Sequence, residues 1–139
     1  MPIANRRPLL VPAFAAIVLA AASLPLAAAG PASTIAVFYG GEAGLDACAG
    51  LGHVVALKRG GDNFLSVRGG PATSHREIDR LKMGQHVSMC DERGDWIGIV
   101  YTKSGQRCGV GTPVARRQPY RGPCRSGWVH RDFVELLAG

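Results

Sequence analysis

The sequence predicts a small all-β domain behind a cleavable leader. Two observations predict the fold class: short runs of apolar and β-branched residues alternate with Gly-, Asp- and Pro-containing turns, and no stretch keeps a helical period beyond two turns. The chain beyond the leader has about 110 residues, which suits one domain. Strands this short and this evenly spaced form a barrel or a sandwich.

Residues 1–29 predict a signal peptide. Arg6 and Arg7 are the only charged residues there, and residues 9–26 form an uncharged, mostly apolar run, as in the n-region and h-region of a leader. A retained anchor is the alternative, because the run is just long enough to span a bilayer. Its prolines and the absence of a basic cluster behind it favour cleavage, which we place after Ala29. We therefore expect a periplasmic or secreted protein with no stable membrane anchor after cleavage.

Residues 30–52 are rich in Gly and Ala and predict an N-terminal lead-in or linker. One apolar run, residues 35–39, is compatible with either a strand or an ordered lead-in. We accordingly expect the folded domain to cover residues 53–139.

From residue 53 onward the strand-like runs are HVVALKR, FLSVR, REIDRL, HVSMC and WIGIVY. Successive side chains on a strand point to opposite faces. In the last of these runs the alternation places Ile97, Ile99 and Tyr101 on one face, which we assign to the core. Trp96 and Val100 lie on the other face.

Five motifs in order give a more specific prediction. The segment LSVRGGP at residues 65–71 resembles the LNVRSGPSTS signature of bacterial SH3 domains, and it is followed by a Lys-Met-Gly turn at residues 82–84, the strand at residues 87–89, GDWIGIVY at residues 94–101 and SGWVH at residues 126–130. The match covers about 70 residues, from 64 to 137. The motif residues we single out are Arg68, Gly69, Gly70, Pro71, Trp96, Gly127 and Trp128.

The chain is thus similar to the bacterial SH3 family. The resemblance implies a small SH3-like β-barrel that Trp128 helps to close, and it implies binding of cell-wall peptidoglycan or of peptides in envelope proteins. A barrel of this size holds only side chains in its interior. We therefore expect the ligand on its outer surface.

One long insertion departs from the family pattern. About twenty residues, KSGQRCGVGTPVARRQPYRGPC, stand where the family has a tight hairpin. The chain has four cysteines, and an even number in an exported domain predicts two disulfides with three possible pairings. Because Cys108 and Cys124 bracket the insertion, we favour their pairing, which leaves Cys48 for Cys90. A bond closing the insertion would stabilise the fold by about 3 kcal/mol in the chain-entropy model.

The positive charge is concentrated around this insertion. Residues 96–131 contain seven basic residues and no acid. For an exported chain this favours an anionic cell-wall polymer or an acidic envelope protein over nucleic acid, and solvated surface charge is the alternative. The alternative to wall binding is a small periplasmic or secreted inhibitor or scaffold that acts on another protein through this loop. The candidate ligand-binding residues are Arg116, Arg117, Tyr120, Arg121 and Arg125.

The sequence does not favour an enzyme. Four residues separate His86 and Cys90, or about 13 Å along a strand, which is too far for a nucleophile and its base. No GxSxG elbow is present, and the cysteine spacings do not match a zinc site. We expect a non-catalytic protein without metal or cofactor.

Overall fold

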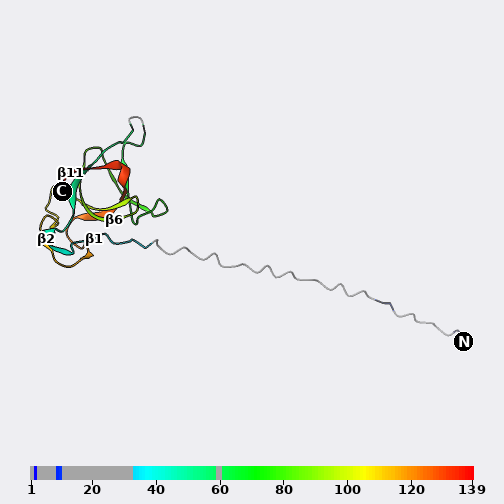
Figure 1. The fold of residues 1–139 in the computed structure, drawn as a ribbon. Coiled ribbons are helices and arrows are strands. Elements are labelled where there is room, and N and C mark those ends of the chain that lie inside the picture. Colours follow the sequence, from blue (N-terminus) through cyan, green and yellow to red (C-terminus); the bar gives the residue numbers. More distant parts are fainter. Residues whose placement is uncertain (1, 3–8, 11–32, 59–60) are drawn as a thin grey trace.

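A computed structural model describes residues 2, 9–10, 33–58 and 61–139, and these residues form short strands and a single 3-10 helix (Figure 1). The predicted signal peptide lies almost entirely outside the described residues. No helix in the described part is long and apolar enough to cross a membrane. The elements are β1 (Phe38–Tyr39), β2 (Glu42–Asp46), β3 (Gly50–Val54), β4 (Leu65–Arg68), β5 (Glu77–Leu81), β6 (His86–Arg93), β7 (Trp96–Tyr101), β8 (Pro113–Val114), β9 (Gln118–Pro119), β10 (Arg125–His130), the 3-10 helix η1 (Arg131–Phe133) and β11 (Val134–Ala138).

The main sheet has seven strands in the order β11-β3-β6-β7-β10-β4-β5, with antiparallel pairing throughout. It curls around its core (Figure 1), yet β5 and β11 remain its two edges. The all-β class is confirmed, whereas the closed barrel that we expected is wrong. Closure requires the first and last strands to pair through their backbones. Here Leu57 and Phe133, which lie outside the strands, pack against the core with their side chains instead.

The core lies on the inner face of this sheet. Ile97, Ile99 and Tyr101 are buried there, as the alternation along β7 predicts. Gly127 of β10 faces the same side, where a Cβ would overlap the side chain of Val67. The remaining buried members of this cluster are Val54, Leu65, Val67, Leu81, Val87 and Val129.

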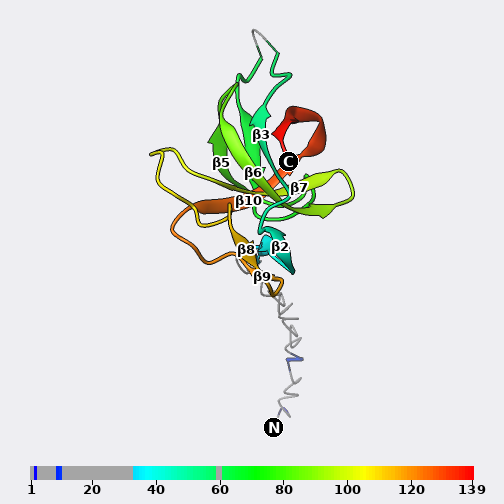
Figure 2. The same ribbon diagram turned by 60° about the vertical axis from the view of Figure 1, so that its left-hand side comes forward.

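A second layer covers the outer face of the main sheet. Its strands belong to two small sheets, β1-β9 and β2-β8, which join the N-terminal segment to the insertion. Figure 2 shows β2, β8 and β9 below the main sheet. The outer-face residue Val100 is fully buried in a cluster with Cys48, Val110 and Tyr120.

Residues 30–52 are therefore more than a linker in this structure. From residue 38 onward they form β1, β2 and the first part of β3. The domain boundary predicted at residue 53 falls inside β3, which pairs with β6 and β11 in the main sheet. The sequence pattern does not reveal these strands because their partners lie about 70 to 80 positions further along the chain.

Trp128 anchors the N-terminal segment and does not point into the barrel-like core. It is fully buried, but it pairs with Gly98 on the face opposite to Val129. Its indole Nε1–H donates to the carbonyl of Ile35 at 2.9 Å. A Cβ at Gly98 would lie 3.0 Å from Val37 and 3.3 Å from the indole, so the small residue makes room for this packing.

Two disulfides connect the layers. Cys48 bonds to Cys90 of β6, and Cys108 bonds to Cys124. This is the favoured pairing of the three, and no described cysteine is free. Because stable disulfides persist in oxidising surroundings, they indicate a compartment outside the cytoplasm.

Candidate binding site

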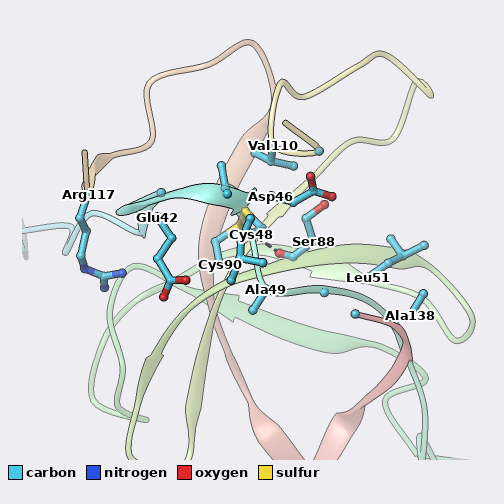
Figure 3. Close-up of a pocket in the computed structure, with 17 residues that line it drawn as sticks. Glu42, Asp46, Cys48, Ala49, Leu51, Ser88, Cys90, Val110, Arg117 and Ala138 are labelled. Carbon is cyan, nitrogen blue, oxygen red and sulfur yellow. Dashed lines mark hydrogen bonds between the residues drawn. A yellow bond between two sulfur atoms is a disulfide. The ribbon is translucent and has the colours of Figure 1, made fainter. Parts of the chain in front are cut away.

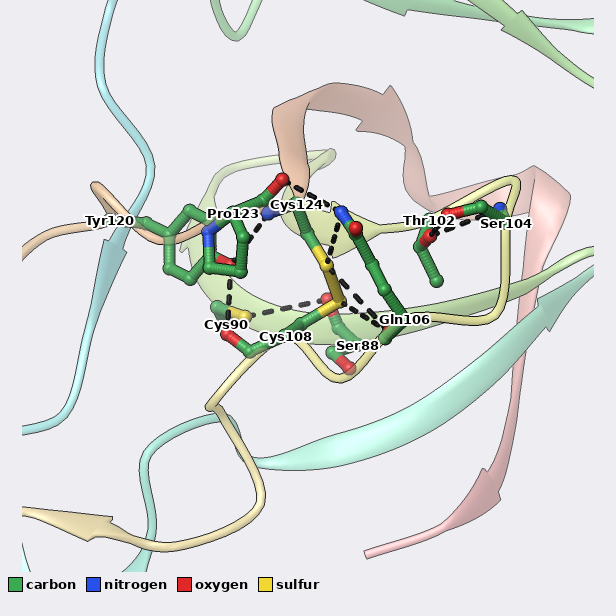
Figure 4. The surroundings of a disulfide bond; sticks show 9 residues. All are labelled: Ser88, Cys90, Thr102, Ser104, Gln106, Cys108, Tyr120, Pro123 and Cys124. Carbon is green, nitrogen blue, oxygen red and sulfur yellow. Dashed lines mark hydrogen bonds between the residues drawn. A yellow bond between two sulfur atoms is a disulfide. The ribbon is translucent and has the colours of Figure 1, made fainter.

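Tyr120 holds the insertion together from inside. Its hydroxyl donates to the carbonyl of Cys108 at 2.8 Å and accepts from the backbone N–H of Cys124 at 3.2 Å. The side-chain N–H of Gln106 donates to the carbonyl of Pro123 at 2.8 Å. Hydrogen bonds from Tyr120 and Gln106 thus surround the Cys108–Cys124 disulfide (Figure 4). With 9% of its surface exposed, Tyr120 presents little side chain to the ligand that the sequence analysis expects it to contact.

Arg117 is committed to a buried acid. Its guanidinium donates to Asp91 of β6 at 2.5 Å, and the side chain of Asp91 is 3% exposed. The same carboxylate accepts the backbone N–H groups of Phe38 and Glu92, both at 3.0 Å. This contact ties the insertion, the N-terminal segment and the main sheet at one point.

Arg125 is paired as well. It lies in β10 and donates to Asp79 of β5 at 3.1 Å, while Lys103 binds the other carboxylate oxygen at 2.6 Å. Burial alone would raise the pKa of Asp79, but bonds from Lys103, the backbone of Arg80 and Tyr101 outweigh it and lower this pKa to about 2. Burial and the bond to Asp79 raise the pKa of Tyr101.

Of the four arginines in the predicted set, Arg116 and Arg121 are the two without an ion pair among the described residues. Both side chains are exposed, and neither has a carboxylate partner among the described residues. Acids from elsewhere in the chain thus pair with four of the seven basic residues of the acid-free stretch. Its paired residues are Lys103, Arg117, Arg125 and Arg131, whose partners are Asp79, Asp91 and Glu92.

The motif residues singled out in the sequence lie in turns and packed positions. Arg68 donates to the carbonyl of His75 at 2.9 Å across the turn that contains Gly69, Gly70 and Pro71. A Cβ at Gly70 would lie 2.5 Å from the His75 ring, which explains the glycine. Trp96 packs edge-on against His130, with ring centroids 5.5 Å apart.

One concavity was not predicted from the sequence. It is an open groove made of two adjoining cavities of about 890 and 520 Å³, beside the Cys48–Cys90 disulfide (Figure 3). We call it the disulfide groove. The two cavities share Ala49, Gly50, Cys90 and Arg117 as lining residues.

A closed loop forms one wall of this groove. The backbone N–H of Gly40 donates to Ala47 at 2.7 Å, and that of Gly41 donates to Val114 at 2.8 Å. Both glycines have positive φ, +75° and +114°, a conformation that only glycine adopts readily. The loop between these bonds contains β2, all of whose residues are exposed.

Apolar side chains with large exposed fractions border the groove. Leu45 of β2 is 60% exposed, Leu51 of β3 is 40% exposed and Leu136 of β11 is 57% exposed. Exposed apolar side chains around a concavity are typical of a binding surface. We therefore regard the disulfide groove as the candidate binding site.

The sequence offered one weak signal for this site. Cys48 was expected to bond to Cys90, which predicts that the Gly-rich residues around Cys48 lie on the sheet. Nothing in the local pattern indicated that β2 would stand clear of the sheet and leave a groove behind it.

Among the described residues, no three His, Cys, Asp or Glu side chains gather closely enough to hold a metal ion. Comparisons with family models, with curated proteins and with solved structures find no match to this chain. The candidate site therefore rests on its own geometry.

Proposed function

We propose that this chain is a non-catalytic binding module of the cell envelope, SH3-like in type, that recognises a cell-wall component or an envelope protein or peptide. The observation that carries the proposal is the disulfide groove, an open concavity bordered by exposed leucines. The sequence motifs shared with bacterial SH3 domains and the two disulfides, which suit an oxidising compartment, support it.

The chemistry of the groove suits binding better than catalysis. Its larger cavity, of about 890 Å³, falls in the range of ligand sites. Cys48 and Cys90 are joined to each other and offer no thiolate. Ser88 also lines the cavity, but the lining contains no histidine to act as its base.

A blocking variant tests the proposal. Gly44 lines the larger cavity, and a Cβ there meets no atom within 4 Å, so Gly44→Trp adds a large side chain at the groove from a position with open space around its Cβ. Ser74→Trp, at an exposed position outside the lining, is the matched control. The full chain, exported with its own leader, is incubated with purified cell-wall sacculi and with immobilised envelope proteins.

We expect the parent and Ser74→Trp to be retained on one of these materials, and Gly44→Trp to lose most of that retention. Equal retention of Gly44→Trp would remove the groove as the site. Absence of parent retention on both materials would refute the proposed function.

A second candidate function is inhibition or scaffolding of an anionic partner through the insertion. The supporting observation is that Arg116 and Arg121 are exposed and have no acidic partner among the described residues. The double variant Arg116→Gln with Arg121→Gln should then be retained less than the parent on immobilised envelope proteins at low salt, where exposed charges act over longer distances. Arg76→Gln with Lys82→Gln, also at exposed positions, is the charge-matched control.

A further inference from the structure

The disulfide groove carries a charge opposite to that of the chain. The chain as a whole has a formal net charge of +6. Four carboxylates line the two cavities, those of Glu42, Asp46, Asp91 and Glu92, against the single guanidinium of Arg117. The local excess of negative charge favours a cationic ligand.

Two of the four carboxylates that line the groove are free to bind a cationic ligand. Asp91 is buried and engaged by Arg117, and Glu92 lies 3.4 Å from Arg131. Glu42 and Asp46 are exposed, and no described side chain bonds to either carboxylate. Figure 3 shows them in the wall of the groove, with the disulfide between them in this view.

An open sheet edge borders the same groove. Within the described residues β11 pairs only with β3, and Ala138 at its end lines the larger cavity. Leu136 and Leu137 of β11 are exposed. Charged residues are the usual protection of a sheet edge against pairing with another chain, and the only one that β11 carries is Glu135.

The opposite edge is different. In β5, Glu77, Asp79 and Arg80 stand along the strand and are held in ion pairs. An extended segment can add to an exposed edge through backbone hydrogen bonds, with its side chains entering neighbouring pockets. Of the two edge strands, β11 carries fewer charged residues than β5, and it lies next to the disulfide groove.

We propose that the disulfide groove binds an extended segment of another protein that carries lysine or arginine side chains. Its backbone lies along β11, and its cationic groups meet Glu42 and Asp46. This inference rests on the proposed function and selects the protein segment as the ligand over the cell-wall polymer.

Synthetic octapeptides test the inference. The probe alternates threonine and lysine, carries a fluorophore and is titrated with the full oxidised chain by fluorescence anisotropy. Comparison probes replace lysine by glutamine or by glutamate, and one lysine probe is N-methylated at alternate residues so that it cannot bond to a sheet edge. The protein variants are Glu42→Gln with Asp46→Asn, and Asp62→Asn with Asp95→Asn as a control that removes two exposed charges elsewhere.

We expect the lysine probe to bind and the glutamine probe to bind about fivefold to tenfold more weakly, as suits two exposed ion pairs. The Glu42 and Asp46 variant should lose this preference, the control should keep it, and N-methylation should weaken binding. Binding should also decrease with added salt.

Equal affinity for the lysine, glutamine and glutamate probes would overturn the inference. Retention of the parent on sacculi, lost in Gly44→Trp, together with no binding of the lysine probe would also overturn it and would leave the proposed function in place. If the parent binds neither sacculi, envelope proteins nor any probe, both are wrong.

Discussion

Replacement of Trp128 by alanine tests the two-layer architecture directly. Trp128 is fully buried on the outer face of the main sheet, and its indole N–H donates to Ile35 at 2.9 Å. Its ring packs beside Gly98, and the guanidinium of Arg93 lies 5.2 Å from its centroid. Trp128→Ala therefore removes core volume and also the hydrogen bond that holds the segment leading into β1.

The expected loss is large for a chain of this size. Replacing a buried tryptophan by alanine typically costs about 3 to 5 kcal/mol of unfolding free energy, a major part of the 5 to 15 kcal/mol typical of a small domain. Trp128→Phe keeps an aromatic ring and removes the N–H donor. We expect it to cost about 1 to 3 kcal/mol, because the Ile35 carbonyl loses its partner.

Thermal unfolding followed by circular dichroism measures both variants. For a domain of this length the alanine variant should melt at least about 15 °C below the parent, with the phenylalanine variant between them. Trp96→Ala is the control, because Trp96 lies on the same sheet face but is only partly buried. An unchanged melting temperature for Trp128→Ala, or an equal loss for Trp96→Ala, would refute the role assigned to Trp128.

Three further predictions concern bonds that cross the fold. Thiol titration of the denatured, unreduced protein should find no free thiol, and Cys108→Ser with Cys124→Ser should lower stability by about 3 kcal/mol; two reactive thiols in the parent would contradict the pairing. Asp79→Asn should lower the unfolding free energy by about 2 kcal/mol at pH 7. Because the folded pKa of Asp79, about 2, lies below the unfolded value of 3.8, this contribution is present above about pH 4 and is lost as the pH falls towards 2. An acid unfolding curve of the variant identical to that of the parent would exclude it. Arg117→Ala leaves buried Asp91 without its cation and should lower the unfolding free energy by about 3 kcal/mol, which urea titration against Arg116→Ala can verify.

The sequence predicts the main sheet better than the layer that covers it. β4, β5, β6 and β7 all fall within or over the runs expected from alternation and turn residues, and β10 contains the SGWVH motif singled out in the sequence. The inward side chains of β7 are also as expected, because period-two alternation directly reflects which face is buried. The open edges are not visible in such a pattern, because each strand looks the same whether the sheet closes or not.

The covering layer and the groove depend on distant contacts. β1, β8 and β9 have two residues each, too few to show alternation, and they are stabilised by partners far along the chain. The surface charge of the insertion also depends on distant contacts. A run of basic residues without acids predicts a positive surface, but Asp79, Asp91 and Glu92 lie beside it in the fold and form ion pairs with four of its seven cations.

The disulfide pairing has a consequence for how the chain matures. Each bond joins cysteines that are consecutive in the sequence, Cys48 with Cys90 and Cys108 with Cys124. A chain that enters an oxidising compartment with its N-terminus first presents these cysteines in the same order. The first bond can therefore form before the second pair emerges, and native pairing can be reached by joining each cysteine to the next one in the sequence. In either of the other two pairings, no bond could form until Cys108 or Cys124 of the insertion had emerged.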